Sequence, residues 1–121
     1  MAILRKYTVQ EALNIDVAAK WDVQTALSVN DSYAHATESI CVTDTANGID
    51  YHQVAIDVGG NDEVYFSFGT DKTVAPSVST DIQLANDSLT FVKIPKGIGD
   101  LIYLKFICDT GESATVKVVL M

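Results

Sequence analysis

The 121-residue sequence predicts a single all-β domain, an antiparallel β-sandwich of immunoglobulin-like or jelly-roll-like type. Three observations lead to this prediction. Short runs in which polar and apolar residues alternate recur along the chain, and turn-forming residues separate them at intervals of roughly ten residues. Hydrophobic residues make up 48% of the chain, which supplies one core. Alternation does not encode strand order, so a closed barrel stays open as an alternative to the sandwich.

The alternation is clearest between residues 50 and 71. Polar and apolar residues alternate at 53–58, which predicts a strand with one buried and one wet face. Residues 63–71 predict a second strand, in which Val64, Phe66 and Phe68 share one side. The Gly-Gly-Asn-Asp sequence at 59–62 is a strong turn signal, so we expect these two strands to form a hairpin.

Residues 72–87 are polar and contain Pro76, which predicts a long connection with at most a short extended piece. The next segment, residues 88–94, alternates again and places Leu89 and Phe91 on one side. Pro95-Lys96-Gly97 then predicts a turn, because proline presets φ and glycine tolerates positive φ.

The C-terminal part predicts two further strands. Residues 100–108 are almost continuously apolar, which is typical of a central strand covered on both faces. A turn is expected at 109–112. The last strand follows, with Val116 and Val118 alternating with polar neighbours.

The first half of the sequence is less regular. Residues 22–29 and 38–45 each fit a strand. For residues 8–20, the alternation of Leu13, Ile15 and Val17 favours a strand over a short helix. The domain is expected to cover residues 1–121, with residues 1–8 forming either an arm or an edge strand.

Charge and hydropathy exclude several classes of function. The net charge is −8 and the eight basic residues do not cluster, which argues against nucleic-acid binding. No run approaches the roughly 20 apolar residues of a transmembrane helix. At the N-terminus the apolar run at residues 1–4 precedes the basic residues, the reverse of a secretory signal, so we expect neither a signal peptide nor a membrane anchor.

The two cysteines, Cys41 and Cys108, lie in apolar strand-like runs. Free cysteine is commonly buried as a small hydrophobic residue, and without an export signal we expect two buried free thiols. A disulfide stays open, because pairing depends on geometry that the sequence does not contain. Neither cysteine has the neighbours of a metal site.

Catalytic and cofactor signatures are missing from the sequence, so we expect a protein that is not an enzyme and binds no cofactor. His35 and His52 are the only histidines, and no GxSxG or nucleotide-binding glycine motif occurs. Most aspartates fall in predicted turns, where their side chains serve local hydrogen bonds. Asn61-Asp62-Glu63 could offer oxygens to calcium but lacks the EF-hand spacing.

Two features suggest binding surfaces. Trp21 and Tyr33 could form an exposed aromatic platform for carbohydrate, although a lone tryptophan is more often a core or rim residue. The apolar segment at residues 1–4 could pair with a neighbouring subunit, as added strands do. An edge strand of its own domain is the equal alternative.

Residues 64–121 resemble small β-sandwich virion proteins of tailed bacteriophages. The resemblance lies in Phe66-Ser67-Phe68-Gly69, a polar loop with Val74-Ala75 and Ser79-Thr80-Asp81, the turn near Pro95, the strand Tyr103-Leu104-Lys105-Phe106-Ile107 and a valine-rich final strand. It is a pattern of hydropathy and turns with few fixed residues.

The resemblance implies a virion structural protein, foremost a capsid decoration (cement) protein that binds and stabilises the head shell. The partners would be the major capsid protein or other virion proteins, and the chain would form a homo-oligomer, with a trimer favoured. The protein would be made in the host cytoplasm and sit on the capsid surface. The expected interface residues are Ile3, Leu4, Tyr7 and Trp21. A carbohydrate- or host-surface-binding module is the alternative.

Overall fold

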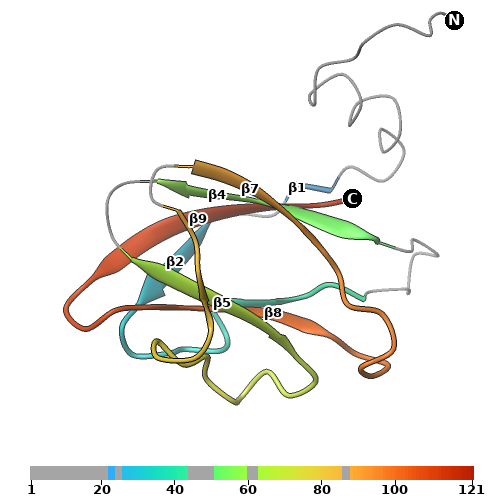
Figure 1. Ribbon diagram of the computed structural model, residues 1–121, viewed down its shortest axis with the longest axis horizontal. Helices are drawn as coiled ribbons and strands as arrows, with labels where there is room; N and C mark the ends of the chain where they lie inside the picture. The colour runs from blue at the N-terminus through green and yellow to red at the C-terminus, as the bar shows by residue number, and fades with distance from the viewer. Residues whose placement is uncertain (1–21, 24–25, 44–50, 60–62, 86–87) are drawn as a thin grey trace, which may run out of the picture.

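The computed structural model describes residues 22–23, 26–43, 51–59, 63–85 and 88–121. These residues form two antiparallel β-sheets packed face to face, drawn as an upper and a lower layer in Figure 1. The described part of the chain contains no helix, and so none that could span a membrane. The predicted all-β sandwich is therefore confirmed.

Sheet A has the order β1-β9-β4-β7, and β2 also pairs with β9, so that β1 and β2 follow one another along the same side of β9. Its strands are β1 (Asp22–Val23), β2 (Leu27–Asn30), β4 (Gln53–Gly59), β7 (Ser88–Lys93) and β9 (Ser113–Leu120). Sheet B has the order β3-β8-β5-β6. Its strands are β3 (Ser39–Cys41), β5 (Val64–Gly69), β6 (Ile82–Gln83) and β8 (Tyr103–Cys108).

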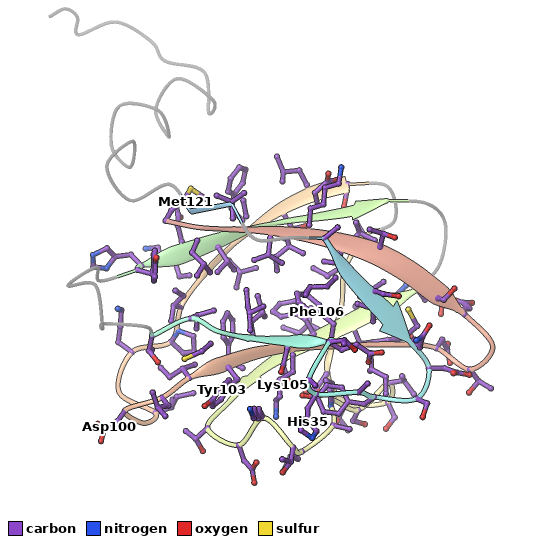
Figure 2. The ribbon with its side chains drawn as sticks, turned by 180° about the vertical axis from the view of Figure 1, so that it is seen from behind. His35, Asp100, Tyr103, Lys105, Phe106 and Met121 are labelled. Carbon is purple, nitrogen blue, oxygen red and sulfur yellow. The ribbon has the colours of Figure 1, made fainter. Side chains whose placement is uncertain are left out.

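The core lies between the two sheets and follows the period of two. Fully buried side chains come from the inward positions of the central strands, and they include Val54, Ile56, Val58, Val64, Leu104, Phe106, Val116 and Val118. Figure 2 shows Phe106 between the two layers. Burying a side chain of this size contributes about 1.5–3 kcal/mol, so these positions supply most of the drive to fold.

The predicted hairpin of β4 and β5 is wrong. β4 pairs with β7 and β9 in sheet A, whereas β5 pairs with β6 and β8 in sheet B, so the two strands belong to different sheets. The alternating patterns of both strands were assigned correctly, since Val54 and Val64 are both fully buried. Their apolar sides meet across the core, where face-to-face packing satisfies the same alternation that a hairpin would.

The other strands and turns expected in the second half are present, although β8 begins at Tyr103 and not at residue 100, and the Leu89 and Phe91 side of β7 faces solvent. The long connection after β5 contains only the two-residue β6, and β8 is a central strand of its sheet. Gly97 and Gly111 have φ values of 91° and 80°, which places glycines in the left-handed region at both predicted turns. In the first half, 22–29 contains β1 and β2, and 38–45 contains β3. Residues 1–8 and 8–20 lie outside the described residues.

Both cysteines are free thiols, but only Cys108 is buried. Cys41 is half-buried, so the expectation of two buried thiols is correct for one of them. Cys41 lies opposite Tyr103, five residues along β8 from Cys108. At the rise of a strand this corresponds to roughly 17 Å, far beyond the reach of a disulfide.

Candidate functional site

The most elaborate surface feature in the described residues is the connection between β5 and β6, residues 70–81, here called the anchored loop. It lies on the outer face of sheet B, the face turned away from sheet A (Figure 1). Connections in compact domains usually have about four to six residues, and longer ones are often functional. Hydrogen bonds fix the conformation of the anchored loop. Some come from a lysine of the underlying strand β8, and others form between residues of the loop itself.

Lys105 of β8 attaches the anchored loop to the outer face of sheet B by hydrogen bonds. It alternates with Leu104 and Phe106, which face the core, so its side chain leaves the opposite face of sheet B, as Figure 2 shows. The ammonium donates hydrogen bonds to the backbone oxygens of Asp71 at 3.3 Å and Val74 at 2.8 Å. Only 5% of the residue is exposed, and a buried charge of this kind requires such partners.

Small residues beside Lys105 let the loop approach the sheet. Ser39 and Ser67 lie directly opposite the lysine on the two neighbouring strands. Gly69 is closer still, since a Cβ atom there would stand 2.8 Å from the lysine Nζ. A larger side chain at position 69 would push the lysine away from the loop.

Polar contacts within the loop add to this anchor. The Asp71 carboxylate accepts hydrogen bonds from the Thr73 hydroxyl at 2.6 Å and the Thr73 backbone N–H at 3.0 Å, and these two bonds hold the pKa of Asp71 below its usual value. Asp81 accepts from the Ser77 N–H at 2.6 Å. Pro76 is buried. The prediction that aspartates serve local turn hydrogen bonds is confirmed at both positions.

A second loop, residues 31–38, contacts the anchored loop. The Tyr33 hydroxyl donates to the backbone oxygen of Lys72. Behind it, the fully buried Glu38 carboxylate accepts hydrogen bonds from the N–H groups of Asn30 at 3.0 Å and Ala34 at 3.1 Å. Burial raises the pKa of Glu38, and these two hydrogen bonds partly offset the rise. The carboxylate therefore fixes the backbone that carries Tyr33.

His35 lies in the same second loop and is half-buried. Its ring centroid lies 6.4 Å from that of Tyr33, and its Nδ1 is buried without a hydrogen-bond partner in the described part of the chain. Figure 2 places His35 on the same side of the molecule as Lys105. His52 is exposed and precedes β4. The two histidines are thus at different places, and the described residues do not join them in one site.

The loops present apolar side chains to solvent. Val74 is 56% exposed and Val78 is 40% exposed, while Ile82 in the adjoining β6 reaches 66%. Apolar side chains on a rigid support bind another surface at little entropic cost, because their backbone is already ordered. The arrangement is suited to protein–protein contact.

Carboxylates gather at another place, where β5 begins and β8 ends. A side-chain hydrogen bond with Asp109 raises the pKa of Glu63, and burial and the nearby charge of Glu112 raise it further. The N–H of Glu63 donates to the Glu112 carboxylate, and the N–H of Asp109 donates to the backbone oxygen of Glu63. The described residues contain no set of three or more His, Cys, Asp and Glu arranged to hold a metal ion.

The residues expected to form a partner interface, Ile3, Leu4, Tyr7 and Trp21, lie outside the described residues, as do Asn61 and Asp62. Tyr33 is described, but its hydroxyl serves the anchored loop. The burial of Lys105 was missed by the sequence analysis. A lysine inside an almost continuously apolar strand, with a long polar connection elsewhere, was the available signal.

The chain was compared with protein-family models, curated proteins and solved structures, and none of the three comparisons gave a match.

Proposed function

We propose that the protein is a virion structural protein, most specifically a capsid decoration protein that binds the head shell through the anchored loop and β6. One observation carries the proposal: Val74 and Val78 are exposed on a loop that a buried lysine holds in place, and Ile82 is exposed in the adjoining β6. Such a role requires a preformed surface rather than reaction chemistry. The resemblance of residues 64–121 to phage virion proteins supports the choice of partner.

The position of these residues supports contact with the surface of another protein. The exposed residues come from a loop and from an edge strand, and Val74 and Val78 belong to one segment in which backbone oxygens accept hydrogen bonds from Lys105 and Tyr33. Stable contacts of this kind bury roughly 800 Å² per partner, and a few central apolar residues supply most of the binding energy. The N-terminal residues Ile3, Leu4 and Tyr7 remain predicted as additional contacts.

Co-sedimentation with head shells, assembled from the major capsid protein of the same genome, tests the proposal. The variant Val74→Asp with Ile82→Asp should lose most shell binding, because it replaces two exposed apolar side chains with charges. The control, Ala26→Asp with Thr115→Asp, adds two charges at exposed positions just before β2 and in β9 and should bind as the unmodified chain does.

The outcomes separate the hypotheses. Absence of shell binding by the unmodified chain would overturn the proposal. Binding that survives in Val74→Asp with Ile82→Asp would exclude the anchored loop, and loss on deletion of residues 1–7 would then assign the contact to the N-terminal arm.

A further inference from the structure

The edges of the two sheets differ in length. Within the described residues, three of the four edges are short or irregular: β3 has three residues, β6 has two, and β1 and β2 pair with β9 in registers that differ by one residue. Short and irregular edges are common protection against unwanted strand pairing. β7, Ser88–Lys93, is different, because it runs for six residues and β4 is its one partner among the described strands.

The backbone phase of β7 follows from its pairing. The N–H of Ile94 donates to the oxygen of His52, so the even-numbered residues of β7 direct their N–H and C=O groups toward β4. Alternate residues of an antiparallel strand point to opposite sides. The backbone N–H and C=O groups of Leu89, Phe91 and Lys93 therefore point away from β4. No described strand pairs with them on that side.

The same residues carry exposed apolar side chains. Leu89 is 57% exposed and Phe91 is 37% exposed, while Val92 packs against the core. Protected edges usually carry a proline, a bulge or a charge in mid-strand. β7 has none of these before its last residue, Lys93. The edge thus offers hydrogen-bonding groups and apolar surface together.

We propose that a second copy of this chain pairs with β7, antiparallel to it, across a two-fold axis at Phe91. The two copies of sheet A then form one continuous sheet. In this register the outward groups of Leu89, Phe91 and Lys93 all find partners, and Phe91 lies opposite the partner's Phe91. A two-fold contact of this kind closes on itself and does not propagate into a filament.

Charge complementarity favours a second copy as the occupant. Within its own chain Lys93 lies opposite Gln53, and Asp57 lies between Leu89 of β7 and Lys117 of β9. In the dimer Lys93 lies opposite the partner's Leu89. The partner's Asp57 lies opposite that leucine on the following strand, β4 of the partner, so the three residues form one line across the sheet. Two strand spacings separate the lysine and aspartate backbones, roughly 10 Å, which their side chains can bridge. The two-fold axis forms this ion pair twice.

The inference does not depend on what the anchored loop binds, because β7 belongs to the other sheet. It differs from the trimer that the resemblance implies. A single strand pair buries less than the roughly 800 Å² per partner of a standard interface. We therefore expect a reversible dimer with a dissociation constant on the order of tens of micromolar.

Light scattering of the full chain, over about 1 to about 200 µM, tests the proposal by mass action. The mass should rise toward twice the 13.1 kDa of one chain. Leu89→Lys with Phe91→Lys should remain monomeric throughout. The matched control is Ile98→Lys with Leu101→Lys, two residues of similar exposure in the β7–β8 turn, and it should dimerise normally. Circular dichroism establishes that each variant is folded.

A charge exchange tests the register, and circular dichroism checks the fold of each variant, because Asp57 also lies opposite Lys117 of β9. Lys93→Glu and Asp57→Lys should each weaken the dimer about tenfold, and the double variant should recover most of the loss. A monomer at every concentration, a trimer, or a dimer that persists in Leu89→Lys with Phe91→Lys would overturn the proposal. Failure of the double variant to recover would overturn the two-fold register at Phe91.

Discussion

The two outer faces of the sandwich differ in what covers them. On sheet B, a loop and a buried ammonium close the face, and Lys105 in the middle of β8 is 5% exposed. On sheet A, the described residues leave β7 uncovered, and Leu89 in that strand is 57% exposed. A lysine is inside and a leucine is outside. The burial of an outer-face residue therefore depends on what lies over it and not on its hydropathy.

The physical cost of each arrangement is different. The closed face removes a charge from water, which is tolerated because two backbone oxygens accept its hydrogen bonds. At β7 of sheet A, apolar side chains and backbone hydrogen-bonding groups remain in water. This exposure lowers the stability of the fold little, but it favours association with another chain. We therefore regard sheet B as the source of a rigid binding surface and β7 as the place of self-association.

The largest expected effect concerns the two sides of β7. Thr90 directs its N–H toward β4, so Thr90→Pro should lower the free energy of unfolding by about 3 kcal/mol or more. Leu89→Pro removes an N–H that points away from β4 and should cost well under half as much, because proline is tolerated on edges. Urea denaturation at low micromolar concentration measures both. Equal losses would contradict the assigned backbone phase.

The next effect concerns the closed face. Lys105→Met keeps the length of the side chain but removes both hydrogen bonds to the anchored loop, so the free energy of unfolding should fall by about 2 kcal/mol. Amide exchange should quicken in residues 70–81 and stay unchanged in β7. Thermal melts and hydrogen exchange measure the two parts. Unchanged exchange in residues 70–81 would show that Lys105 does not order the loop.

The smallest effect is a pH dependence at Asp71. Its pKa is lower in the folded protein than the usual 3.8, so its contribution to stability is present above that value and is lost as the pH falls through the folded pKa. Asp71→Asn should therefore lower the melting temperature at pH 7, and the difference from the unmodified chain should close below pH 3.8. If the difference in melting temperature does not change with pH, the substitution acts through altered packing of the side chain and not through the loss of its negative charge.

Most of the described fold was predictable from local pattern. The strands from β4 onward and the glycine turns at 97 and 111 appear where alternation and turn residues placed them. The candidate site was not predictable in the same way. Burial of Lys105 depends on a loop that begins on a different strand, and the exposure of Leu89 depends on the edge position of β7. The residues next to positions 105 and 89 in the sequence predict neither the burial of the lysine nor the exposure of the leucine.

The sequence by itself determined where the strands and turns lie, because side-chain alternation and the φ preferences of glycine and proline act within a few residues. Only the tertiary structure decided that β4 and β5 belong to different sheets, since a hairpin and a face-to-face crossing bury the same alternate side chains. It also decided which outer face is closed. That outcome follows from contacts such as the one between Lys105 and Val74, which join residues 31 positions apart.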